Sequence, residues 1–148
     1  MRFMMLVKAD ENSEAGTLPD AQMLADMGKY NESLVNAGVL LAGEGLQQSS
    51  KGARVRFSKG QPRVVEGPFA EAKELVAGFW LIQVKSRAEA LEWAKRVPFQ
   101  EGEIELRQLF EAEDFAPSDP TGEHREAEAR LRERAAAQGT AQNTPQKK

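Results

Sequence analysis

Residues 64–74, Val-Val-Glu-Gly-Pro-Phe-Ala-Glu-Ala-Lys-Glu, place groups suited to acid–base chemistry beside a tight turn. A carboxylate held against apolar walls has a raised pKa, which suits it to act as a general acid or base. We take Glu66 as the candidate acid or base, and Lys73 as a group that holds an anionic ligand or neutralises a second acid. Three neighbours complete the candidate ligand site at this corner: Gly67, Pro68 and Phe69.

The same residues also suit a purely structural corner between two strands. Gly67 can adopt whatever dihedral angles the turn needs, and Pro68 would sit at a helix start, where its missing N–H does no harm. Glu71 and Glu74 would favour the positive end of a short helix, and Phe69 would be an anchor in the core. Residue types alone leave both interpretations open.

Three residues elsewhere in the chain could line a cleft beside Glu66: Tyr30, Glu44 and Trp80. Tyr30 is a second candidate acid–base group. Glu44 lies within an apolar strand pattern, so it needs either a basic partner or a ligand contact. Trp80 belongs either to the core or dimer face, or to an aromatic wall for a flat ligand.

Other catalytic and metal chemistry has few residues to draw on. The chain has no cysteine, which excludes disulfides, thiolate catalysis and thiolate metal sites. Its single histidine, His124, follows a proline-containing polar linker, where a solvated side chain is the simpler interpretation. Only carboxylates remain as metal ligands, and they lack calcium-loop spacing, so we expect neither a metal nor another cofactor.

Charge and hydropathy narrow the range of partners. The 23 acidic and 20 basic side chains give a net charge of −3 without a basic stripe, so we do not expect direct binding to nucleic acid. The first apolar run covers only the five residues 3–7, between Arg2 and Lys8, which is too short for a signal peptide or a membrane span. We therefore expect a cytoplasmic protein with no membrane contact.

Apolar runs and capping motifs predict a β-α-β unit, a hairpin and a second β-α-β unit. Thr17-Leu18-Pro19-Asp20 suits the start of the first helix and Gly38 its end. Ser86 suits the start of the second helix and Pro98 its end. We expect strands over residues 3–7, 39–42, 53–58, 63–65, 78–84 and 104–110. This order is that of an α+β, ferredoxin-like fold with an added hairpin.

The helices of such a fold cover only one face of its sheet. The opposite face would expose large apolar side chains, for which the candidates are Phe3, Met5, Phe79 and Leu81. An uncovered face of this kind indicates a partner, and the simplest partner is a second copy related by a two-fold axis. We therefore expect a homodimer.

The C-terminal part of the chain is much more polar. We expect one domain over residues 1–115 and a flexible extension over 116–148. Within the extension, residues 122–137 suit a mostly solvated helix, and residues 138–148 have a composition typical of disorder.

The nonapeptide Glu-Gly-Pro-Phe-Ala-Glu-Ala-Lys-Glu at residues 66–74 resembles a family signature. In the DGPF branch of the YCII-related family, Asp-Gly-Pro-Phe is followed by Ala-Glu and Lys-Glu. Residues 41–47 (LAGEGLQ) and 78–82 (GFWLI) resemble the same family, and the likeness spans about residues 2–110. The resemblance implies a dimeric α+β barrel, in which two ferredoxin-like sheets close on each other.

The chain departs from the family pattern at two points. The signature aspartate is Glu66 here, whose side chain is one methylene longer, and catalytic geometry is sensitive to such a shift. The catalytic proposal for the family's better-studied branch pairs a histidine with an aspartate, but residues 1–123 contain no histidine. That pair is not carried over, so a carboxylate or Tyr30 would have to perform any chemistry.

The resemblance implies functions of different classes. The first is a small-molecule-binding protein of the YCII-related, DGPF type, which holds an unknown ligand in an apolar cavity on the sheet face. The alternatives are a cofactor-independent enzyme with Glu66 as acid or base, or a regulatory module linked to transcription. The missing histidine favours binding, and whether the chain catalyses a reaction is left open.

Overall fold

The computed structural model describes residues 1–142 of the 148-residue chain, with side chains to residue 139. The chain divides into two compact units, Met1–Leu109 and Phe110–Lys148. The first unit holds every sequence-predicted site residue. The expected boundary at residue 115 stays a prediction. Of the stretch 138–148, for which we expect disorder, residues 138–142 belong to a helix instead, and residues 143–148 lie outside the described residues.

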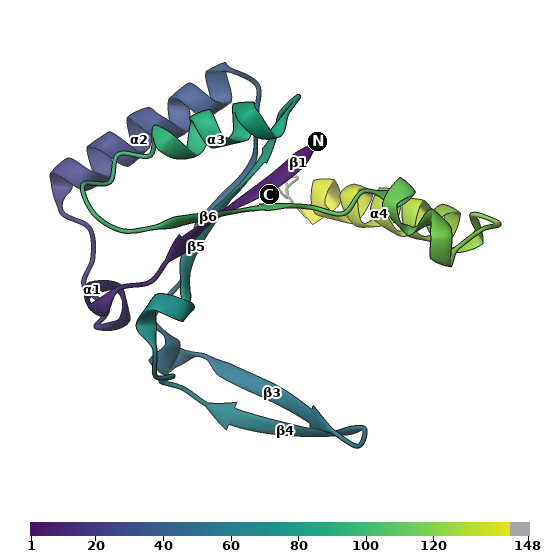
Figure 1. Cartoon of the computed structure of the whole chain (residues 1–148), viewed down its shortest axis with the longest axis horizontal. Helices are drawn as coiled ribbons and strands as arrows, with labels where there is room; N and C mark the ends of the chain where they lie inside the picture. The colour runs from purple at the N-terminus through teal and green to yellow at the C-terminus, as the bar shows by residue number, and fades with distance from the viewer. Residues whose placement is uncertain (143–148) are drawn as a thin grey trace, which may run out of the picture. The chain divides into compact units, whose positions relative to one another are not determined.

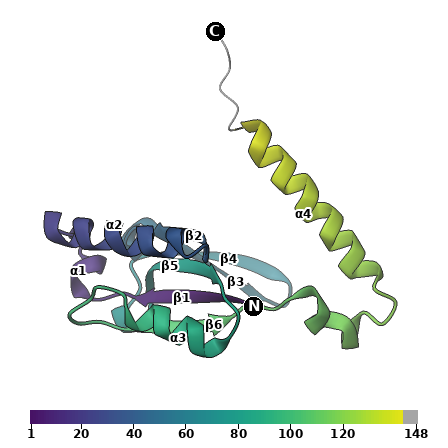
Figure 2. The ribbon, with the colours of Figure 1, turned by 90° about the horizontal axis from the view of Figure 1, so that it is seen from above.

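A four-stranded antiparallel sheet forms the centre of the first unit, with the strand order β2-β5-β1-β6. Its strands are β1 (Arg2–Lys8), β2 (Leu40–Gly45), β5 (Val76–Gln83) and β6 (Ile104–Gln108). Helices α2 (Ala21–Asn36) and α3 (Arg87–Lys95) lie on the same side of this sheet (Figures 1 and 2). The predicted α+β, ferredoxin-like plan is confirmed.

The helix ends follow from side-chain caps. The Oδ1 atom of Asp20 accepts a hydrogen bond from the backbone N–H of Met23 at 2.8 Å, so α2 starts three residues later than a cap at Thr17 would give. An aspartate satisfies a free N–H group of the first turn at least as well as a threonine does. Ser86 caps α3 as predicted, accepting from Glu89 N at 3.1 Å.

The helix-covered face of the sheet carries the core. Phe3 is paired with Ile82 and Met5 with Trp80, and all four side chains are buried against the helices. The prediction that Phe3 and Met5 lie on the uncovered face is therefore wrong. Every residue of the run 3–7 is apolar, so the sequence does not show which alternate set faces the helices.

The uncovered face carries the other alternate set. Met4 is paired with Leu81 and Leu6 with Phe79, and these four partly buried side chains form what we call the open face. Polar residues flank it on the outer strands. Glu44 of β2 is paired with Phe79, and Glu105 of β6 is paired with Leu6.

A separate two-stranded hairpin, which we call the arm, joins β2 to β5. It consists of β3 (Ala53–Ser58) and β4 (Gln61–Glu66). The arm runs out from one end of the four-stranded sheet, on the side away from α2 and α3 (Figures 1 and 2). Every arm residue except Val65 is exposed.

The second unit contains a 3₁₀ segment, η3 (Ala112–Ser118), and a long helix, α4 (Glu123–Gln142). Asp119 is buried and accepts hydrogen bonds from His124 N at 3.2 Å and Arg125 N at 3.0 Å. Burial alone would raise the pKa of the Asp119 carboxyl, but these N–H donors and the Arg125 guanidinium lower it overall. The helix runs past the predicted end at residue 137, because the alanine- and glutamine-rich sequence continues it through Gly139.

Candidate functional site

Gly67 is fixed by the close approach of another segment. Its N–H donates to the Gly52 carbonyl at 3.0 Å, and the peptide bond between Gly67 and Pro68 is cis. A Cβ atom on Gly67 would lie 1.8 Å from the carbonyl oxygen of Ser49. Glycine is therefore needed because a second backbone occupies the place of a side chain. Gly67 has no positive φ, so the conformational freedom that the sequence predicts for it is not what requires a glycine here.

Ser49 connects the corner to the N-terminal part of the chain. It begins the 3₁₀ segment η1 (Ser49–Lys51), and its backbone N–H donates to Glu14 Oε1 at 3.0 Å. Its hydroxyl donates to Glu14 Oε2 and accepts from the N–H of Phe69 at 3.1 Å. Glu14 ends the short helix α1 (Glu11–Glu14), so three segments distant in sequence meet at one serine.

Sequence reasoning missed both Glu14 and Ser49. They are separated by 35 residues, and neither belongs to a motif that marks a contact at that separation. The only available signal was a hydroxyl-bearing residue placed before Gly52 in a turn, which is common in loops.

We expect Ser49→Ala to lower the free energy of unfolding by about 1–2 kcal/mol, because it removes two hydroxyl hydrogen bonds from partly buried groups. Urea unfolding measures this loss. Ser50→Ala is the matched control, since Ser50 is exposed and its removal should change the stability by less than about 0.5 kcal/mol. Equal stabilities of the two variants would show that Ser49 does not hold the corner.

Phe69 lies beneath a basic side chain of the arm. The guanidinium carbon of Arg54 is 3.9 Å from the centroid of the Phe69 ring, which is a cation–π geometry. Phe69 is only partly buried and does not belong to the helix-side core, in contrast to the structural interpretation of the sequence, which predicts a core anchor. Phe69 therefore joins the corner to the base of the arm.

The charged residues of the corner are all exposed. Glu66 ends β4, directly opposite Ala53, and Lys73 lies in the 3₁₀ segment η2 (Ala72–Glu74). Within residues 1–139, neither forms a salt bridge, and Glu44 also forms none with a basic side chain. These carboxylates and the lysine are open to solvent and to a ligand.

Tyr30 and Trp80 lie on the helix side of the sheet, in contact with each other. Their ring centroids are 5.3 Å apart in an edge-to-face arrangement. The Tyr30 hydroxyl donates to the Trp93 carbonyl at 2.8 Å, and Trp80 Nε1 donates to Asn31 Oδ1 at 2.8 Å. Glu44 lies on the opposite face, so one cleft does not hold these three predicted site residues together.

Burial raises the pKa of the Tyr30 hydroxyl from 10.0 to about 12, although Arg96 nearby lowers it. The folded state therefore holds this proton more tightly than the unfolded state, so Tyr30 should lower stability as the pH rises from 10 to about 12. Because Tyr30 is the only tyrosine, absorbance at the tyrosinate band reports it directly. We expect a midpoint near 12 in the folded protein and near 10 in denaturant, and Tyr30→Phe should remove the signal. A folded-state midpoint at 10 would contradict the buried position.

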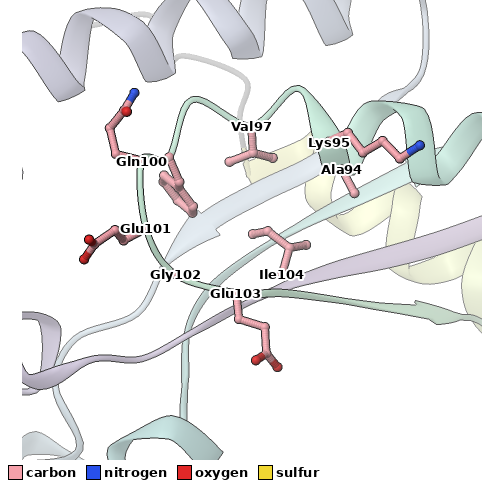
Figure 3. A pocket seen from close by; sticks show the side chains of 9 residues that line it. Ala94, Lys95, Val97, Gln100, Glu101, Gly102, Glu103 and Ile104 are labelled. Carbon is pink, nitrogen blue, oxygen red and sulfur yellow. The ribbon is translucent and has the colours of Figure 1, made fainter.

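A shallow hollow of about 190 Å³ lies between the end of α3 and β6, and Figure 3 shows its lining. Val97 and Ile104 form part of its apolar wall, while the side chains of Gln100 and Glu101 turn away from them. No predicted site residue lines this hollow. It is a separate feature from the corner.

The described part of the chain offers no grouping of side chains suited to a metal ion. Among those residues, no three His, Cys, Asp or Glu side chains lie close enough together to hold one. Within the same range, the helices are either too short or too polar to cross a bilayer.

The strand order of the sheet and the helices on one of its faces define a ferredoxin-like α+β domain. The sequence profile of the YCII-related domain matches residues 1–113, so the chain belongs to that family. It is also 37% identical, over 76 residues, to an uncharacterized protein of Rhizobium meliloti (strain 1021). That match covers 51% of this chain and 61% of the relative, so the chain matches less than two thirds of the relative's length.

Proposed function

We propose that this chain is a small-molecule-binding protein of the DGPF type, which holds its ligand over the open face within a homodimer. The observation that carries the proposal is the open face itself. Met4, Leu6, Phe79 and Leu81 form one apolar surface on a sheet whose other face is already filled by helices. A contiguous apolar surface with polar groups at its margin is typical of a ligand or subunit contact.

Polar groups beside the open face would orient a bound molecule. Glu44 stands next to Phe79 on the neighbouring strand and is exposed. On the other side, the guanidinium of Arg107 lies 3.4 Å from the Glu105 carboxylate, which leaves that pair able to exchange partners with a ligand. An apolar ligand with one or two polar substituents fits this distribution.

A ligand screen by thermal shift, followed by calorimetric titration of each hit, tests the proposal. Leu81→Arg places a charge in the middle of the open face and should weaken binding at least tenfold. Leu24→Arg is the matched control, because Leu24 is 61% exposed on α2 and should leave binding unchanged. Hits that bind the Leu81→Arg variant as tightly as the wild type would place the ligand elsewhere.

A cofactor-independent enzyme with Glu66 as acid or base is the second candidate. It is favoured by the exposed Glu66 carboxylate beside a corner that three hydrogen bonds through Ser49 hold in place. General acid–base catalysis needs a positioned carboxylate, and the backbone held by these contacts begins directly after Glu66. If a hit is turned over, Glu66→Gln should abolish turnover with binding retained, and Glu66→Asp should keep part of it. Full turnover by Glu66→Gln would exclude this role.

A further inference from the structure

The two faces of the arm differ sharply in character. Directly paired residues share a face, so Val55 and Val64 lie on the same side as Phe57 and Pro62. Val55 is 52%, Val64 61% and Phe57 74% exposed. The opposite face carries three arginines: Arg54, Arg56 and Arg63. The arm therefore presents one apolar face, which also includes Ala53, and one basic face.

An arm of this composition needs a covering layer. A two-stranded hairpin alone is marginally stable in water, and additional strands or a packed layer are normally required. The part of its own chain that forms the first unit supplies no such layer, since Val65 is the only arm residue that is even partly buried. A row of exposed valines and a phenylalanine indicates an interaction surface.

A second copy of this chain suits that surface best. The first unit of each chain carries two apolar surfaces that its helices leave uncovered, the exposed apolar face of the arm and the partly buried open face. A two-fold arrangement can cover both surfaces at once, because the arm of each copy can pack against the open face of the other. An unrelated partner would have to match two separate surfaces.

The areas of the open face and of the arm also favour a second copy as the partner. Strands spaced by about 4.8 Å with a rise of about 3.3 Å per residue give the four-stranded sheet a footprint of about 400 Å² and the arm one of about 200 Å². A stable interface buries about 800 Å² on each partner. The open face alone is about half of that. The open face and the arm together approach it, because side-chain relief makes the accessible area larger than the footprint.

We infer that the arm of one copy lies with its apolar face against one part of the open face of a second copy, which leaves the rest of that face to the ligand, and that the exchange is reciprocal. Glu66 is paired with Ala53 and shares the apolar face of the arm. In this arrangement Glu66, at the base of the arm beside the Gly67 corner, lies at the margin of the contact between the two copies. This inference rests on the proposed homodimer and makes each binding site a product of two chains.

Sedimentation equilibrium tests the inference with variants of exposed residues that leave the protomer core intact. The wild type should have the mass of two chains. Phe57→Asp combined with Val64→Asp should raise the dimer dissociation constant at least 100-fold, because two charges enter an apolar interface. Arg56→Ser is the matched control on the basic face, and it should change the constant less than threefold. Circular dichroism checks that all variants keep the native fold.

Cross-linking supplies an independent readout, because the wild type has no cysteine. An equimolar mixture of the single variants Phe57→Cys and Leu81→Cys should form mixed pairs, joined by a disulfide or by a bismaleimide cross-linker. Arg56→Cys with Leu81→Cys should form few. A wild type with the mass of one chain would overturn both this inference and the proposed dimer. A dimer that the double aspartate variant leaves intact would overturn the arm exchange alone.

Discussion

Gly67→Ala is expected to lower the free energy of unfolding by about 3 kcal/mol. The added Cβ would lie 1.8 Å from the Ser49 carbonyl oxygen and 2.7 Å from its carbonyl carbon. Both are backbone atoms, which cannot rotate aside as the end of a flexible side chain can. The corner must therefore separate from η1, which weakens the bond from Gly67 N to the Gly52 carbonyl and the bond from Phe69 N to Ser49.

Urea unfolding measures this effect, and Gly28→Ala is the matched control. Gly28 lies inside α2, and apart from its chain neighbours and the backbone of its own helix no atom lies within 4 Å of the place that an alanine methyl would take, so the same change should stabilise the protein by about 0.5–1 kcal/mol. The two glycine substitutions should thus have opposite signs. A Gly67→Ala variant within about 0.5 kcal/mol of the wild type would mean that the segments do not pack as described.

Gly67→Ala should also be non-additive with Ser49→Ala. Both changes disrupt the contact between the corner and η1, so the double variant should lose less than the sum of the single losses. The difference between that sum and the loss of the double variant is the coupling free energy between Ser49 and Gly67.

The element order was predictable because its signals are local. Ser86 precedes its helix by one residue and accepts from Glu89 N, a contact within a single turn. The strand β5 is an apolar run bounded by polar residues, and the hairpin turn is marked by Gly60. Each of these signals depends only on neighbours in sequence.

Which face of each strand meets the helices was not predictable, because it depends on pairing with strands that are distant in sequence. In β1, the alternate sets Phe3 and Met5, and Met4 and Leu6, are equally apolar. Which set meets the helices is decided by pairing with β5, where Trp80 and Ile82 face α2 and α3. When both faces of a sheet are apolar, its strands lack the polar–apolar alternation that would show in the sequence which side chains face the helices.

The candidate site was predictable only in part. Gly-Pro at residues 67–68 marks a corner, and the structure has one there. The partners that fix it, Glu14 and Ser49, come from distant parts of the chain and carry no spacing signal. Tyr30 and Trp80 were grouped with Glu66 by chemical type, whereas their positions depend on which face of α2 and β5 meets the core.

Trp80→Ala is expected to have the largest effect on stability, a loss of about 3–5 kcal/mol in the free energy of unfolding. The indole is 4% exposed, packs edge-to-face on Tyr30 and donates to Asn31 Oδ1. Removing it leaves a large cavity between the sheet and α2. It also leaves open space beside Gly43, whose absent Cβ would have lain 2.9 Å from Trp80 Cδ1.

Two comparison variants separate the contributions of the indole. Asn31→Ala removes the hydrogen bond and should cost only about 1–2 kcal/mol, since the indole N–H is left without its partner but the packing remains. Trp80→Ala with Gly43→Ala should recover part of the loss, because the added methyl enters the space that the indole vacated. Urea unfolding measures all three variants. A ligand-contact role for Trp80 would instead leave stability nearly unchanged and weaken binding, so a loss below about 1 kcal/mol would show that the indole does not belong to the core.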